Sequence, residues 1–154
     1  MDRKRIISGC LVIFAALASS EWAHAALGGS SDTITADRKA LQAVHRATTP
    51  HNRYTVVEVV SDATTVREYV SPSGVVFGIA WNGYVHPDLK QLLGSYWGEY
   101  SAARQKSAHL FGRKRQQLTT SNIVVEKWGH MRNLQGRAYV PGLLPVGVSV
   151  NEIK

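Results

Sequence analysis

The alternation of hydrophobic and polar residues predicts a group of β-strands in the first half of the chain. Three segments, at 54–60, 64–70 and 74–81, are rich in β-branched and aromatic residues, which favour extended backbone. Residues 71–74 fit a type I turn with a bulge, so we expect antiparallel hairpins. The third segment is apolar on both faces, which indicates a central strand. We expect Val75, Phe77, Ile79 and Trp81 on one face, and Val76, Gly78 and Ala80 on the other.

After residue 83 the hydrophobic period changes from two to about 3.6, which predicts one long amphipathic helix over 86–106. Pro87 suits the first helical position, and the charge of Asp88 in the first turn opposes the helix dipole. Small residues recur at steps of four, and we expect this ridge to approach the strand face that carries Gly78 and Ala80. The apolar stripe is Leu89, Leu92, Leu93, Tyr96, Trp97 and Tyr100, and the small residues are Gly94, Gly98 and Ala102.

The pattern then returns to strands. Residues 122–131 and 134–140 predict a second hairpin that turns near Arg132-Asn133, and prolines and glycines make 141–150 an irregular arm. A thin apolar stripe predicts a short helix between Thr35 and Arg46. The predicted fold is therefore α+β, a mainly antiparallel sheet of about five strands with one long amphipathic helix packed across it and a short N-terminal helix.

The first 25 residues have the pattern of a secretory signal peptide. A basic start at residues 3–5 precedes an apolar run, and Ala23 to Ala25 fit a signal-peptidase site, so we expect cleavage between Ala25 and Ala26. The run is shorter than the about 18 residues of a spanning helix, which disfavours a membrane anchor. We divide the chain into a signal peptide (1–25), a polar lead-in with the short helix (26–52) and a single α+β domain (53–154).

Signal cleavage changes what the composition implies. The one cysteine, Cys10, leaves with the signal peptide, so the mature chain has neither a disulfide nor a thiol nucleophile. Cleavage removes three basic and two acidic residues from a chain of net charge +7, so the mature protein stays basic. The sequence contains no phosphate-binding loop, dinucleotide fingerprint or hydrolase elbow, and we expect no cofactor and no metal.

Four segments in the same order resemble an uncharacterised family of exported proteobacterial proteins, the domain of unknown function 2844. The resemblance covers nearly the whole mature chain. It implies a Gram-negative bacterium and a periplasmic or secreted location, and it assigns no activity, cofactor or catalytic residue. The segments are residues 26–29, 67–83, 87–100 and 129–149.

The second predicted hairpin could form a small anion site. Strand alternation places Trp128, His130 and Arg132 on one face, where Arg137 and Tyr139 of the returning strand could join them. A histidine beside two guanidiniums on an aromatic floor could hold a carboxylate or a phosphate. The alternative is the exposed face of an edge hairpin, where charged residues discourage aggregation.

Two weaker groups of polar residues remain. No acid occurs between residues 101 and 125, and the basic residues there could contact an anionic envelope component, or form a solvated loop; we do not expect specific nucleic-acid binding. His86 with Asp88 and Glu58 could form a metal site or an acid–base pair, although a proline and an acid also suit a helix start. The basic residues are Arg104, Lys106, Arg113, Lys114 and Arg115.

These patterns favour an exported, non-catalytic accessory or binding module for an anionic ligand, an envelope component or a partner protein. The alternative is a small periplasmic enzyme that uses His130 with Arg132 or Arg137, or His86 with Asp88. A third hypothesis is a structural envelope component that self-associates through the C-terminal arm. A concave pocket in which at least two of these side chains converge would favour the enzyme.

Overall fold

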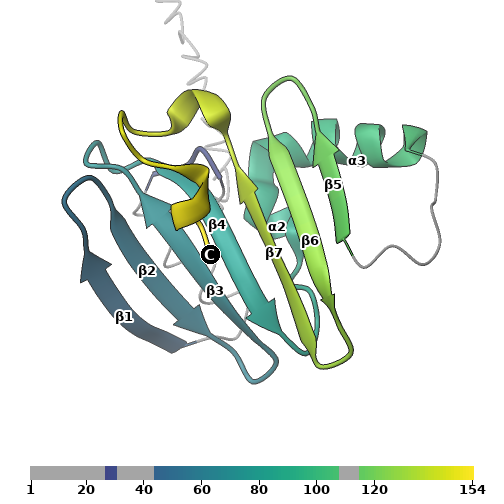
Figure 1. Ribbon diagram of the computed structural model, residues 1–154, viewed down its shortest axis with the longest axis horizontal. Helices are drawn as coiled ribbons and strands as arrows, with labels where there is room; N and C mark the ends of the chain where they lie inside the picture. Colours follow the sequence, from purple (N-terminus) through teal and green to yellow (C-terminus); the bar gives the residue numbers. More distant parts are fainter. Residues whose placement is uncertain (1–26, 31–43, 108–114) are drawn as a thin grey trace, which may run out of the picture.

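The computed structural model of the protein describes residues 27–30, 44–107 and 115–154. These residues form an antiparallel sheet with a helical segment on one face and an irregular C-terminal arm (residues 141–154) on the other (Figure 1). We call these the helix face and the arm face. The strand order is β1-β2-β3-β4-β7-β6-β5, with bounds β1 Val44–Pro50, β2 Thr55–Val60, β3 Thr64–Val70, β4 Val76–Gly83, β5 Arg115–Thr119, β6 Val124–His130 and β7 Asn133–Tyr139.

Strand β4 lies in the middle of the sheet, as its two apolar faces predicted. Its face assignment was partly wrong because β4 contains a bulge. Tyr69 on β3 pairs with Gly78, and the next residue of β3 pairs with Val76, so Phe77 is an extra residue. Phe77 therefore packs with Ala80 on the arm face. Val76, Ile79 and Trp81 pack in the main core on the helix face.

The helical segment runs without a gap from Leu89 to Lys106, as α2 (Leu89–Leu93), a 3₁₀ turn η2 (Gly94–Tyr96) and α3 (Trp97–Lys106). Its expected apolar stripe is the side that packs on the sheet, with Leu92 and Tyr100 fully buried. The prediction that the row of small residues on this segment packs against β4 is wrong. Gly98 is exposed and has nothing within 4 Å of its Cβ position, because Gly78 and Ala80 face the arm instead.

The C-terminal arm closes the second face of the sheet. It contains two 3₁₀ turns, η3 (Pro141–Leu143) and η4 (Val150–Glu152), and it crosses β3, β4 and β7 (Figure 1). Ile153 is fully buried there with Tyr69 and Phe77. A Cβ atom at Gly78 would lie 2.8 Å from Ile153 Cδ1, so glycine at this position allows the arm to lie against the strand.

The sheet has seven strands, so the prediction of about five was wrong. The two additional strands, β1 and β5, are the outer strands of the sheet and are mostly exposed and polar. The expected N-terminal helix would have ended at Arg46, but residues 44–46 belong to β1; the rest of that prediction, 35–43, lies outside the described residues. Among the described residues, no helix is long and apolar enough to span a membrane.

Candidate functional site

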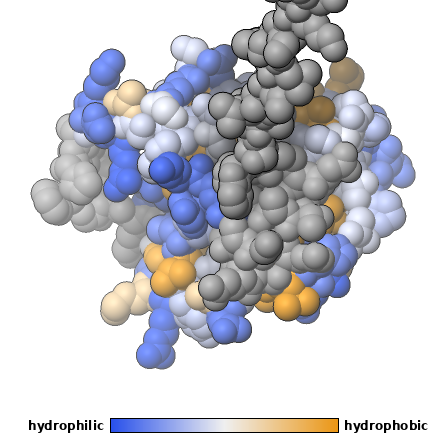
Figure 2. All heavy atoms as spheres, turned by 180° about the vertical axis from the view of Figure 1, so that it is seen from behind, coloured by the Kyte–Doolittle hydropathy of each residue, from blue (hydrophilic) through white to orange (hydrophobic). Residues whose placement is uncertain are grey.

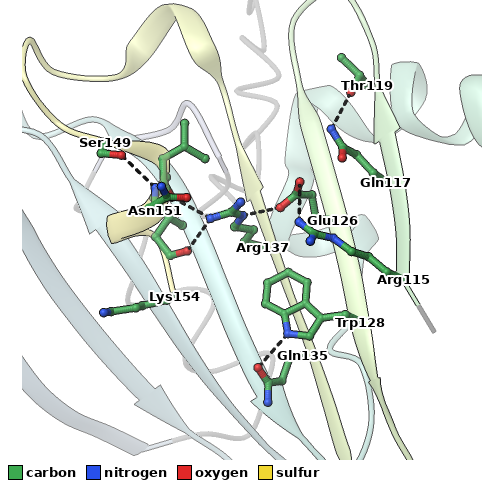
Figure 3. Close-up of polar contacts among 12 residues, drawn as sticks. Arg115, Gln117, Thr119, Glu126, Trp128, Gln135, Arg137, Ser149, Asn151 and Lys154 are labelled. Atoms are coloured by element: carbon green, nitrogen blue, oxygen red, sulfur yellow. Dashed lines mark hydrogen bonds and ion pairs between the residues drawn. The ribbon is translucent and has the colours of Figure 1, made fainter.

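A buried carboxylate organises the arm face of the sheet around β6 and β7. Glu126 on β6 pairs directly with Arg137 on β7, and Arg137 Nε donates to Glu126 Oε2 at 2.5 Å. Arg115 on β5 reaches the other carboxylate oxygen, with 3.4 Å between Nη2 and Oε1 (Figure 3). Glu126 therefore lies between two guanidiniums, which compensate the cost of burying its charge.

Arg137 also holds the C-terminal arm. Its Nη1 donates to the carbonyl oxygens of Val150 at 2.8 Å and Ile153 at 3.3 Å (Figure 3). The Arg137 side chain is 13% exposed, whereas that of Arg115 is 63% exposed. The two arginine side chains consequently differ in how available they are to a ligand. Arg137 is fixed by internal contacts, while Arg115 presents its guanidinium to solvent.

The ring of Trp128 lies close to both arginines. The Cζ atoms of Arg115 and Arg137 are 5.9 Å and 6.0 Å from the ring, a distance at which cation–π attraction operates. Trp128 Nε1 donates to Gln135 Oε1 at 2.9 Å, which fixes the ring orientation (Figure 3). Around the ring is an open depression of about 420 Å³, here called the Arg–Trp depression, lined by Arg115, Trp128, Gly129, His130 and Arg137.

Three of the five residues expected at this site line the Arg–Trp depression, namely Trp128, His130 and Arg137. Tyr139 lies beside them, with its ring 5.9 Å from Arg137 Cζ, and burial raises the pKa of its hydroxyl. Arg132 does not line the depression. It lies in the β6–β7 turn with a positive φ of 66°.

The basic residues that the sequence grouped together are divided by the structure. Arg104 and Lys106 are exposed in the last turn of α3, on the helix side of the sheet. Arg115 belongs to the Arg–Trp depression on the other side. Arg113 and Lys114 lie outside the described residues. The described part therefore shows no single basic cluster.

The proposed pair of His86 and Asp88 has structural roles. Trp81 Nε1 donates to His86 Nδ1 at 3.0 Å, and the pKa of His86 is lowered by burial and by the nearby Lys127. Asp88 caps α2 by accepting a hydrogen bond from the backbone of Lys90. Glu58 lies on the arm face, where it pairs with Arg67 at 3.0 Å. No group of three metal-ligating side chains occurs within the described ranges.

The amino-acid sequence matches a known protein family. A family model described as "Protein of unknown function (DUF2844)" matches residues 23–153. The chain belongs to the DUF2844 family. This confirms the family that the sequence indicated, while export and a proteobacterial origin stay predictions. No curated protein and no solved structure matched the chain.

This DUF2844 protein has a second, larger groove that the sequence did not predict. It has a volume of about 800 Å³ and runs over β1, β2 and β3 beside the C-terminal arm. At its end His51 stacks on Tyr54 at 4.6 Å, and the Tyr54 hydroxyl donates to Glu152 Oε2 at 3.0 Å. Burial, with Glu152 as the next cause, raises the pKa of Tyr54 to about 12. Tyr54 therefore stays protonated and is a poor nucleophile or base at neutral pH.

Glu126 is the residue of the DUF2844 site that sequence reasoning missed. The sequence could have revealed it through the β6–β7 hairpin, because the correct strand pairing places Glu126 directly opposite Arg137. A turn at Arg132-Asn133 would have placed Trp128 there instead. The observed turn lies one residue earlier, at Met131 and Arg132, and this shifts the pairing by two residues.

Proposed function

We propose that the protein is an exported, non-catalytic binding module that holds an anionic ligand at the Arg–Trp depression. The supporting observation is the exposed guanidinium of Arg115 beside the ring of Trp128, in an open depression that His130 also lines. A carboxylate or phosphate can take two parallel hydrogen bonds from such a guanidinium. A flat part of the ligand can stack on the indole ring.

The contacts of the candidate catalytic residues support binding over catalysis. Arg137 Nε contacts Glu126, and its Nη1 contacts two backbone carbonyls of the arm, so this residue helps to shape the depression. His86 and Asp88 stabilise a tryptophan and a helix start. His130 and Arg137 do line the same depression, which is the arrangement that an enzyme would require. Its described lining adds no carboxylate, hydroxyl or thiol that could act with His130 on one substrate atom, and this favours binding.

Two features support export, and the family resemblance adds the expectation of a Gram-negative periplasm. The first is the signal-peptide pattern with its expected cleavage between Ala25 and Ala26. The second is the position of Leu27, which is buried and whose backbone N–H donates to the carbonyl of Leu92 at 3.0 Å. The folded domain thus engages the chain directly after the expected cleavage point, so cleavage there would leave this contact intact.

Native mass spectrometry of protein purified gently from the envelope fraction of its own host tests this proposal. We expect a non-covalent excess mass that disappears on denaturation, and a denatured mass that begins at Ala26. Arg115→Ala should lose the excess mass. Arg104→Ala, which removes the same charge from an exposed site on α3, should keep it. A bare protein, or an excess mass retained by Arg115→Ala, would contradict the proposed site.

A further inference from the structure

Exposed hydrophobic side chains gather at one end of the sheet. Val44 is 72% exposed, Tyr84 63%, Val85 51% and Met131 90%. We call these four residues the lower rim, because the start of β1, the end of β4 and the β6–β7 turn lie at the lower end of the sheet in Figure 1. Val44 begins β1, Tyr84 and Val85 follow the end of β4, and Met131 occupies the β6–β7 turn.

Strand pairing shows that these positions follow one another along the same end. Val44 pairs with Val60, the last residue of β2. The backbone N–H of Tyr84 donates to the carbonyl of Ala63 in the β2–β3 turn at 2.8 Å. Gly83 pairs with Leu134, three residues after Met131. From β1 to β6 the rim crosses five strand spacings, a length of about 24 Å.

The concentration of exposed hydrophobic residues at this end indicates a function. Single exposed apolar side chains are normal on soluble proteins, but they are then scattered over the surface. Within the described residues, four of the five large exposed hydrophobics belong to the lower rim. The fifth, Val146, lies in the arm at the other end of the sheet, next to Gly147, whose carbonyl accepts from Arg53 in the β1–β2 connection.

The spacing of the rim residues favours a bilayer surface over a protein partner. Polar residues such as Ser61, Asp62 and Arg132 separate the apolar side chains, so the rim does not form the contiguous apolar centre typical of a protein interface. Seen from behind, the lower end of the molecule likewise shows hydrophobic atoms interrupted by hydrophilic ones (Figure 2). Separate apolar tips can each enter a deformable lipid interface, where tyrosine is also favoured.

Charge indicates which lipids the rim would meet. Arg132 adjoins Met131 and can contact a headgroup phosphate, while Asp62 in the β2–β3 turn carries the opposite charge. The long-range attraction therefore comes from the mature chain as a whole, which stays basic after signal cleavage. We propose that the lower rim inserts into the interface of a bilayer that contains anionic phospholipids. This proposal is independent of the Arg–Trp depression on the arm face.

Co-sedimentation with lipid vesicles tests this proposal. The protein is purified from its host, and all variants share the N-terminus established by mass, because an uncleaved signal peptide would itself bind lipid. We expect binding to vesicles of phosphatidylethanolamine with phosphatidylglycerol, and weaker binding to phosphatidylcholine alone. The double variant Val85→Ser/Met131→Ser should bind about tenfold more weakly, because it removes two apolar tips. Val146→Ser, the matched control from the other end of the sheet, should bind as the wild type does.

Three outcomes of the co-sedimentation would overturn the proposal. The double variant could bind as well as the wild type, or Val146→Ser could lose binding equally. The wild type could also fail to prefer vesicles with phosphatidylglycerol. Sedimentation equilibrium gives the competing result, since a dimer abolished by Val85→Ser/Met131→Ser would assign the rim to a protein interface. Thermal unfolding of each variant checks its folding, which exposed substitutions should leave unchanged.

Discussion

At the scale of single residues, Glu126 is the common ion-pair partner of two arginines that differ in exposure. It is buried between Arg115 and Arg137, and it leaves one guanidinium exposed and the other fixed. A similar arrangement occurs on the other side of β4, where Glu58 contacts Arg46 and Arg67. The two groups differ in burial, because Arg67 is 33% exposed and Arg137 is 13% exposed. This difference permits a matched comparison.

We predict that Glu126→Gln lowers the free energy of unfolding by about 3 kcal/mol, because it leaves the buried Arg137 without its counter-charge. Glu58→Gln, in the more exposed group, should cost about 1 kcal/mol or less. Urea denaturation followed by circular dichroism measures both. Equal losses for the two variants would show that burial of the arginine does not determine the cost.

We predict that the free energy of unfolding depends on pH through His86. Trp81 donates to its Nδ1, and the pKa of His86 is lowered from 6.5, first by burial. The unfolded chain therefore binds this proton more readily than the folded chain does. Stability from this residue is present above pH 6.5, and it is lost as the pH falls from there towards the lower pKa of the folded state.

The test compares urea denaturation of wild type and His86→Gln at a series of values from about pH 7.5 to 5.5. We expect the wild type to lose stability towards the acid end, and His86→Gln to show a flatter dependence. A variant curve parallel to that of the wild type would contradict this role of His86.

At the scale of elements, two glycines should respond oppositely to alanine. A Cβ atom at Gly136 on β7 would collide with Trp81 Cζ2 and lie 2.6 Å from the carbonyl oxygen of Glu126, so Gly136→Ala should cost about 3 kcal/mol. Gly98 in α3 has open space around it, and Gly98→Ala should gain up to about 1 kcal/mol from helix propensity. Thermal unfolding gives both signs, and a loss in Gly98→Ala would indicate an unrecognised contact.

The sequence predicted the elements that bury a hydrophobic face. The hairpins of β2, β3 and β4 and the segment from Leu89 to Lys106 all carry that signal, and all are present. The outer strands β1 and β5 do not, because backbone pairing holds them and their side chains are mostly polar and exposed. Local sequence also could not indicate the bulge at Phe77, which changes the faces of β4.

The candidate site was only partly predictable for the same reason. Strand alternation was enough to group Trp128, His130 and Arg137. Because the turn was predicted one residue too late, the predicted site lacked Glu126 and included Arg132. The part played by Arg115 depends on the pairing of β5 with β6. Such pairing between distant segments is not encoded in the local pattern.

At the scale of the whole molecule, the sheet has two covers of different kinds. The helical segment covers the main core, and the C-terminal arm covers a smaller cluster around Ile153. Because Arg137 bonds both to the arm and to Glu126, the docked arm helps to hold the Arg–Trp depression in shape. Stability and the site are therefore linked through the arm.

We predict that Ile153→Ala lowers the free energy of unfolding by about 3 kcal/mol, since it leaves a cavity among Tyr69, Phe77 and Ala80. Val146→Ala, an exposed position of the same arm, should leave stability unchanged. Urea denaturation of the two variants measures the difference. Similar small effects would mean that the arm contributes little to the fold.

The central claim is that the Arg–Trp depression binds anions, and indole N–H resonances in NMR spectra of ¹⁵N-labelled protein test it most directly. Inorganic phosphate and glucuronate are titrated at constant pH. The account predicts a saturable shift of the Trp128 signal, no shift of the Trp81 signal, whose N–H donates to His86, and loss of the Trp128 response in Arg115→Ala. An unchanged Trp128 signal, or equal shifts of the Trp81 and Trp128 signals, would contradict it.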